Sequence, residues 1–318
     1  GPGNIPFGVD TEEFTTASPV TIAQEGQVWY NSIDKVLKGF GQQGTGVWSS
    51  SGTMPANLYS GGYAGTVDAG VYAGGIPGDV TTTYLYDGAA WTTSPAVLNT
   101  GRHYLVSTGI GTQTAALIFG GEIPGGNTAA TEEFNGTSWA EQNDISSARN
   151  AVVGAGTQTA GLAITGNYTT TVQTYDGLCW ASATATPQAK SYAAGGGTQT
   201  SAILAGGYAP TIVATADTYN GTSWTEISDI NTARSDMGRG VDNDSSGIIF
   251  GGSASPRAQT EEWNGTTWTE VADLGTGRSS PGGDGTSKAA VAAGGNPPNT
   301  GLTEEWSVPN AIKTFTAS

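Results

Sequence analysis

Charged side chains, cysteine and histidine are scarce in this sequence of 318 residues. Charged residues make up 12% of the chain, against roughly 25% in typical soluble domains. The single cysteine, Cys179, excludes an intramolecular disulfide, and its neighbours Leu178 and Trp180 predict a packed thiol. The single histidine, His103, has no cysteine or second histidine with which to bind a metal. We therefore expect His103 to be a surface or loop histidine rather than a catalytic or metal-binding residue.

Long apolar runs are absent, and basic residues are few. No run of about 18 apolar residues is present, so no membrane insertion is expected. Lysine and arginine total 11 against 27 aspartates and glutamates, which gives a net charge of −16. Nucleic-acid phosphates and anionic lipid surfaces both require a basic face. The composition therefore predicts no nucleic-acid partner. The sequence also contains no phosphate-binding loop, dinucleotide-binding fingerprint, zinc-ligand spacing or G-x-S-x-G nucleophile elbow.

Glycine is abundant, with 50 residues, and it follows an internal repeat. There is no three-residue period of the collagen type, and 9 Trp, 12 Tyr and 7 Phe exclude a solvated coil. An eleven-residue segment, such as GTQTAALIFGG from Gly111, recurs six times at intervals of 41 to 46 residues. The copies begin at Gly65, Gly111, Gly156, Gly197, Asp242 and Gly285. The chain is therefore built from repeated units of about 44 residues.

Each unit has the pattern of four short strands. After each copy comes an acidic or Thr-rich strand that ends in an aromatic residue, and in five units an Asp-Gly or Asn-Gly turn leads to a Trp. These tryptophans are Trp91, Trp139, Trp180, Trp224 and Trp268. Asn-Gly and Asp-Gly accept the positive φ angles of a tight hairpin turn. The first strands, such as VVGAG (152–156), are rich in small residues, which suits strands crowded around a common axis.

Four-stranded units repeated radially predict an all-β fold, a β-propeller. A solenoid could share the period, but it requires atypical capping repeats at both ends. A basic residue opens the following unit in five places, at Arg102, Arg149, Lys190, Arg234 and Arg278. In the pairs Glu132-Glu133, Glu261-Glu262 and Glu304-Glu305, adjacent strand residues point to opposite faces. We expect one Glu of each pair to bind a basic residue inside the sheet stack and the other to face solvent, so no catalytic residue is predicted.

The succession of a Gly-Gly pair, an acidic-aromatic strand, a Trp and an Arg resembles a kelch repeat over about residues 50–306. The segments GTQTAALIFGG (111–121) and TEEWNGTTWTEV (260–271) are similar to repeat proteins of marine bacteriophages. This resemblance implies a virion or extracellular location and a role as a tail appendage or another virion-associated protein. Two departures are that Thr165-Gly166-Asn167 replaces a Gly-Gly pair and that the first copy lacks the Arg.

The number of blades depends on residues before the first repeat. We predict an N-terminal extension over 1–24 and a propeller over 25–318. Within it, 25–50 form an irregular blade and 51–318 hold the six kelch-like repeats. This arrangement gives seven blades, with 311–318 as the last strand of the sixth repeat. The alternative is six blades, in which the strand around Trp48 closes the ring on the sixth repeat.

The connections between second and third strands differ in every unit, whereas the other turns are nearly uniform. Variable loops on a fixed scaffold usually carry binding specificity. Tyr168, Tyr208 and Arg257 are the side chains in these loops that most resemble recognition groups. The sequence therefore favours a non-enzymatic module that binds a host-surface glycan or a virion partner protein as a receptor-binding component.

Three alternatives remain beside this reading. A propeller glycan hydrolase or lyase would need carboxylates that converge near the axis, for which Asp236, Asp242 and Asp284 are candidates. A purely architectural or decoration subunit would present flat contacts instead of a pocket. Asp242, Asp244 and Ser246 match the first half of a calcium loop, but Ser253 stands where the bidentate acid is expected. Turn chemistry is the favoured explanation of that segment, so no cofactor is predicted.

Overall fold

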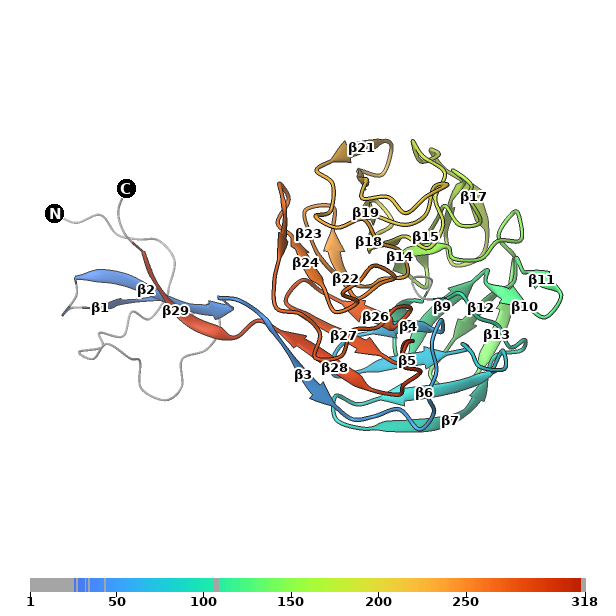
Figure 1. Ribbon diagram of the computed structural model, residues 1–318, viewed down its shortest axis with the longest axis horizontal. Helices are drawn as coiled ribbons and strands as arrows, with labels where there is room; N and C mark the ends of the chain where they lie inside the picture. Colours follow the sequence, from blue (N-terminus) through green and yellow to red (C-terminus); the bar gives the residue numbers. More distant parts are fainter. Residues whose placement is uncertain are drawn as a thin grey trace. The chain divides into compact units, whose positions relative to one another are not determined.

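The computed structural model describes residues 26, 28–31, 33, 35–42, 44–105 and 109–315, and these residues form strands and turns without a helix (Figure 1). The predicted extension 1–24 lies outside the described residues. The chain divides into two compact units. One is Val47–Ser307, and the other combines Gly1–Gly46 with Val308–Ser318. Among the residues that the structure describes, no helix is long and apolar enough to cross a membrane.

The larger unit contains six four-stranded antiparallel sheets, numbered here along the chain. The first contains β4 (Gly62–Gly65), β5 (Gly70–Ala73), β6 (Thr82–Tyr86) and β7 (Trp91–Val97). The second contains β8 (Ile110–Thr112), β9 (Ala115–Phe119), β12 (Thr131–Phe134) and β13 (Trp139–Gln142). A two-stranded hairpin, β10 (Glu122–Ile123) and β11 (Gly126–Asn127), lies in the connection between β9 and β12.

The next three sheets repeat this topology. The third contains β14 (Val153–Thr157), β15 (Ala160–Ile164), β16 (Val172–Tyr175) and β17 (Trp180–Ser182). The fourth contains β18 (Ala194–Thr198), β19 (Ser201–Ala205), β20 (Ala216–Tyr219) and β21 (Trp224–Ile227). The fifth contains β22 (Gly238–Asn243), β23 (Ser246–Phe250), β24 (Thr260–Trp263) and β25 (Trp268–Glu270). The repeat of about 44 residues therefore corresponds to one sheet, as predicted.

The sixth sheet combines both ends of the larger unit. It contains β26 (Gly282–Gly285), β27 (Ala289–Ala293), β28 (Thr303–Ser307) and β3 (Val47–Ser51). Trp48 in β3 lies opposite Trp306 in β28, with ring centroids 5.6 Å apart. This is the place that the six-blade alternative gives to the Trp48 strand.

The smaller unit contains a separate three-stranded sheet. Its strands are β1 (Val28–Asn31), β2 (Val36–Gln42) and β29 (Asn310–Phe315), with β2 in the centre. The predicted pairing of 311–318 with the sixth repeat is wrong, because β29 pairs with β2 while β3 occupies the edge of β28.

The first strands of successive sheets lie side by side, and the sixth sheet also contacts the first. The backbone N–H of Gly65 in β4 donates to Oδ2 of Asp284 in β26 at 3.3 Å. The amide of Ser60 donates to the carbonyl of Ser280 at 3.1 Å. Six antiparallel sheets in mutual contact are consistent with a β-propeller.

The recurring Gln of the Gly-Thr-Gln-Thr turns links each of three sheets to the one before it. The side-chain amide of Gln113 donates to the carbonyls of Gly70 and Tyr86 at 3.0 and 2.7 Å. Gln158 and Gln199 make the same two bonds to the second and third sheets. Each of these bonds satisfies a backbone carbonyl at the seam between sheets.

The paired glutamates behave largely as predicted. Glu132 lies 2.8 Å from Arg102, and equivalent buried pairs join Glu261 to Arg234 and Glu304 to Arg278. The second Glu of each pair is partly exposed, but it also binds the following sheet. Glu133, for example, accepts a bond from the Tyr175 hydroxyl at 2.9 Å. In the third sheet, Gln173 replaces the carboxylate and accepts from Arg149 at 3.0 Å.

Arg239 extends from β22 across the space between the first strands. Its guanidinium donates to the carbonyl of Gly109, next to β8, at 2.6 Å and lies 3.6 Å from the Asp284 carboxylate. A Cβ added to Gly196 in β18 would lie 2.4 Å from the same guanidinium. The glycine-rich first strands therefore leave room for one large side chain among them, which agrees with the predicted crowding around an axis.

Candidate functional site

Tyr168 lies in a turn of left-handed backbone between β15 and β16. Asn167 and Tyr168 have φ angles of +48° and +57°, and the amide of Thr169 donates to the carbonyl of Gly166 at 3.1 Å. Two positive φ angles in the central positions define a type I′ turn. A bulky residue in this region is uncommon and signals a constrained position. The turn leaves 51% of Tyr168 exposed.

Tyr208 extends toward Tyr168 from the corresponding connection of the fourth sheet. Its backbone exchanges two hydrogen bonds with Ser191, at 2.8 and 3.0 Å, which fixes the start of this connection. The Tyr168 and Tyr208 rings meet edge to face, with centroids 5.7 Å apart and planes at 71°. They border a groove of about 550 Å³ that Gln188, Ala189, Ala209 and Pro210 complete.

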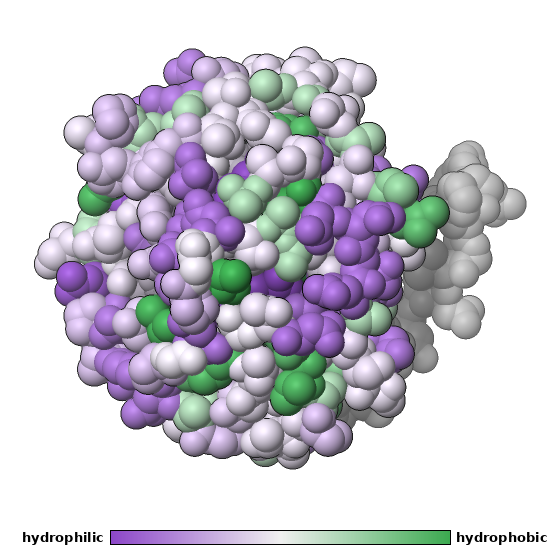
Figure 2. Space-filling model, turned by 90° about the vertical axis from the view of Figure 1, so that its right-hand side faces the viewer, coloured by the Kyte–Doolittle hydropathy of each residue, from purple (hydrophilic) through white to green (hydrophobic). Residues whose placement is uncertain are grey.

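Arg257 does not line this groove. It lies exposed in the connection between β23 and β24 of the fifth sheet, and its backbone carbonyl accepts a bond from the Arg278 amide at 2.8 Å. The structure therefore brings together two of the three predicted recognition residues. Figure 2 shows one face of the molecule, on which apolar side chains form small separate groups among polar ones.

A second site, which the sequence analysis missed, lies where the first strands begin. In each of the six sheets, a residue that is not glycine adopts a left-handed backbone shortly before the first strand, two positions before it in five sheets and six positions before β8. These residues are Ser60, Tyr104, Ala151, Tyr192, Asp236 and Ser280, with φ between +48° and +59°. Their backbones connect neighbouring sheets: the amide of Asp236 donates to Tyr192 at 2.9 Å, and that of Ser280 donates to Asp236 at 2.7 Å.

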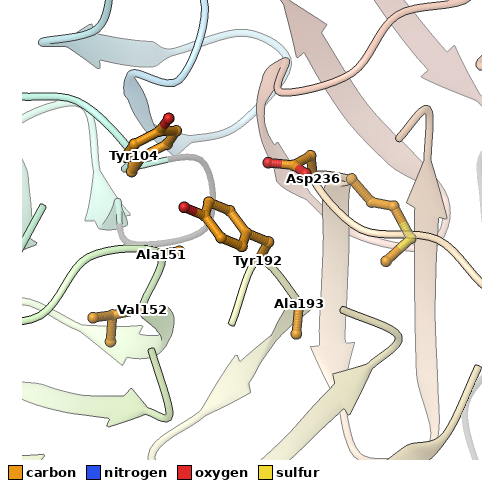
Figure 3. Close-up of a pocket in the computed structure, with 7 residues that line it drawn as sticks. Tyr104, Ala151, Val152, Tyr192, Ala193 and Asp236 are labelled. Carbon is orange, nitrogen blue, oxygen red and sulfur yellow. The ribbon is translucent and has the colours of Figure 1, made fainter. Parts of the chain in front are cut away.

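Three side chains of this set gather around a small cavity. The Tyr104 and Tyr192 rings meet edge to face, with centroids 5.4 Å apart and planes at 83°. Figure 3 shows the Asp236 carboxylate pointing toward the two rings. The cavity of about 10 Å³ is completed by Ala151, Val152, Ala193 and Met237. Such a volume accommodates one small group of atoms.

Burial raises the pKa of all three ionisable side chains that line this cavity. It raises the pKa of the Asp236 carboxyl, while the Ser235 and Ser280 hydroxyls that donate to it act in the opposite direction. Burial also raises the pKa of the Tyr104 and Tyr192 hydroxyls, and the nearby negative charges of Asp236 and Glu122 raise it further. Both tyrosines are therefore neutral donors at neutral pH, beside an acidic group.

The three carboxylates proposed for a hydrolase do not share a cavity. Asp236 faces the cavity beside Tyr104, whereas Asp284 lines a different one, of about 180 Å³, with Arg239 and several glycines. Asp242 accepts bonds from the Ser246 hydroxyl at 3.0 Å and the Ser287 amide at 2.9 Å. Each of these two cavities is therefore lined by one of the three carboxylates, whereas glycoside hydrolysis uses a pair.

The residues of the possible calcium loop lie in the turn between β22 and β23. The Asp242 carboxylate already accepts the bonds from Ser246 and Ser287. The backbone carbonyl of Asp244 accepts a bond from the Trp263 indole at 3.0 Å. Throughout the described ranges, no three His, Cys, Asp or Glu side chains gather closely enough to hold a metal ion. The geometry around Asp242 is that of a turn stabilised by its own side chains.

Two single residues differ from expectation. The prediction of a packed Cys179 is wrong, because its thiol is exposed in the turn that begins at Asp176. His103 lies in the connection between β7 and β8, as expected of a loop histidine, but its side chain is mostly buried and its Nδ1 lies 2.5 Å from the Asp79 carboxylate. No family model matches the chain, and no curated protein is significantly similar to it.

Proposed function

We propose that this protein is a six-bladed, closed β-propeller that acts as a non-enzymatic binding module. The six four-stranded sheets support six blades, and the pairing of β3 with β28 supports closure by strands from both ends of Val47–Ser307. The kelch-like pattern of the repeats supports the same architecture. Closure of this kind leaves only short, protected strand edges, which limits aggregation of a sheet protein.

The ligand that best fits the groove is a glycan. Tyr168 and Tyr208, 51% and 37% exposed, offer apolar ring faces beside open space, while Gln188 supplies an amide that can both donate and accept. Sugars combine apolar C–H faces with hydroxyl groups, so rings next to an amide suit them. The edge-to-face tyrosine pair at the rim of the groove is the observation that carries this proposal.

The location follows from the resemblance to phage repeat proteins. We place the module on a virion or a similar extracellular assembly, where it binds a host-surface glycan. A virion partner protein is the alternative ligand for the same loops. The variable connections that bear Tyr168 and Tyr208 support a recognition role, since such loops tolerate change without affecting the sheets.

The test is binding of the purified chain to a glycan array and to whole bacterial cells. We expect saturable binding that falls about tenfold or more in Tyr168→Ala and Tyr208→Ala, because each change removes one ring of the pair. Tyr30→Ala is the matched control, since Tyr30 is similarly exposed but belongs to the smaller unit. Arg257→Ala should leave glycan binding unchanged, because Arg257 does not line the groove.

Unchanged binding in both groove variants, with folding verified by circular dichroism, would reject the groove as the glycan site. Absence of binding to any glycan or cell would reject the glycan and favour a partner protein or an architectural role.

A further inference from the structure

Asp236 is half-buried and, unlike the four buried carboxylates of the larger unit, has no cationic partner among the described residues. The four buried acids each pair with a basic side chain: Glu132 with Arg102, Asp217 with Lys190, Glu261 with Arg234 and Glu304 with Arg278. The half-buried Asp284 pairs with Arg239. Asp236 accepts only the Ser235 hydroxyl at 2.8 Å and the Ser280 hydroxyl at 3.4 Å. Within the described part of the chain, no Lys, Arg or His forms an ion pair with it.

The surroundings of Asp236 favour a positive charge. An ionised carboxylate removed from water is destabilised unless a cation or several donors compensate it. The Tyr104 and Tyr192 rings beside it present electron-rich faces, which attract cations. Glu122 adds a further negative charge in the same region, and it is bound by the Asn150 side-chain amide at 2.7 Å rather than by a basic group.

We propose that the cavity between Tyr104, Tyr192 and Asp236 binds the primary ammonium group of a ligand. The ammonium donates to the Asp236 carboxylate and lies against the two rings, and so supplies the cation that this carboxylate lacks. The cavity of about 10 Å³ limits the bound group to an unsubstituted –NH₃⁺, whose attached chain leaves toward the loops. The site is separate from the groove at Tyr208 and does not depend on a glycan binding there.

An ammonium group of this kind can come from a lysine side chain of a protein or from an amino sugar. Isothermal titration calorimetry with propylamine tests the shared chemistry. A lysine-containing peptide and glucosamine, each compared with its N-acetylated form, then distinguish the two sources. Tetramethylammonium tests the size limit, because its methyl groups exceed the cavity. We expect propylamine to bind with a dissociation constant on the order of millimolar and tetramethylammonium not to bind.

The decisive variant is Asp236→Asn, which keeps the shape of the side chain and removes its charge. We expect it to weaken propylamine binding about tenfold or more, because a charge-assisted bond becomes neutral. Asp229→Asn is the matched control: it removes one charge from an exposed acid on the same connection between β21 and β22, and binding should remain within about twofold.

Three outcomes would overturn the proposal. These are no propylamine binding to the unmodified protein, equal weakening by Asp236→Asn and Asp229→Asn, or equal binding of tetramethylammonium. Failure of the glycan proposal is recognised separately, because Tyr208→Ala should weaken glycan binding about tenfold or more and leave propylamine binding unchanged.

Discussion

Trp91 in the first sheet donates its indole N–H to the Thr303 hydroxyl in the sixth sheet at 2.8 Å. The same bond joins Trp139 to Thr83 and Trp180 to Thr131, each time from one sheet to the sheet before it. Trp268 of the fifth sheet has no partner for its indole nitrogen among the described residues. The corresponding position in the fourth sheet is Ala216, which has no hydroxyl. At the interface of the third and fourth sheets, Trp224 donates instead to the backbone carbonyl of Thr184 at 2.9 Å. The interface of the fourth and fifth sheets is therefore the one at which the indole of this tryptophan is left without a bond among the described residues.

Replacing Trp91 should cost more stability than replacing Trp268. Trp91→Phe removes a buried hydrogen bond and leaves the Thr303 hydroxyl without its donor, whereas Trp268→Phe removes an unbonded N–H. Both tryptophans are similarly buried, so the loss of apolar contact is comparable. We expect Trp91→Phe to lower the free energy of unfolding by about 1 kcal/mol more than Trp268→Phe. Urea denaturation measures both, and equal losses would contradict a role for this bond.

The two glutamates of one pair should respond very differently to substitution. Glu132→Ala leaves the fully buried Arg102 without its carboxylate and also removes the acceptor for the Asn99 backbone and side-chain amides. Breaking a buried ion pair from one side costs about 3–5 kcal/mol. Glu133→Ala removes a single bond from Tyr175 at a partly exposed site and should cost about 1 kcal/mol. Equilibrium unfolding tests this order, and similar losses would contradict it.

Asp236 should make the protein less stable as the pH rises. Its native pKa is raised above the usual value of 3.8, because burial disfavours the charged carboxylate. A carboxyl of this kind contributes stability below its unfolded pKa and loses that contribution as the pH rises through its native pKa. Asp236→Asn does not titrate, so its stability relative to the unmodified protein should increase from about pH 4 to neutral pH.

Urea denaturation across this range gives the difference between the two proteins, in which the titration of other groups cancels. Asp229→Asn should show no such trend. A relative stability of Asp236→Asn that falls as the pH rises would mean that the carboxylate is stabilised in the folded protein.

Sequence periodicity predicted the four-stranded unit and the Arg–Glu pairs, because both depend on contacts within one repeat. It did not determine the partner of the strand around Trp48, since the spacing of 43 residues from Trp48 to Trp91 fits either arrangement. The strand β29 was misplaced because both β29 and β3 are short strands that could follow β28. Strand pairing between chain ends is a long-range choice that local pattern does not encode.

In the candidate sites too, the sequence pattern indicated residues within one repeat but not the contacts between repeats. Tyr168 and Tyr208 were selected because they lie in variable loops, but their contact depends on neighbouring sheets placing these loops together. Tyr104, Tyr192 and Asp236 share a position two residues after Arg102, Lys190 and Arg234, respectively. This constant spacing from the basic residue is a sequence signal by which they could have been selected as candidates. Their left-handed backbone could not be foreseen, because non-glycine residues adopt it only where tertiary contacts impose it.

A disulfide between β3 and β28 tests the proposed closure directly. Val47 and Ser307 lie opposite each other in the pairing of these strands, and both are exposed. In a Cys179→Ser background, Val47→Cys with Ser307→Cys should form a bond on mild oxidation, detected by loss of free thiols. Because the bond closes a very long loop, the oxidised form should be several kcal/mol more stable than the reduced form. Val47→Cys with Ser182→Cys, which places the second thiol in the third sheet, should remain reduced. Free thiols in the first pair after oxidation would mean that β3 does not occupy the edge of the sixth sheet, and closure by strands from both ends would have to be abandoned.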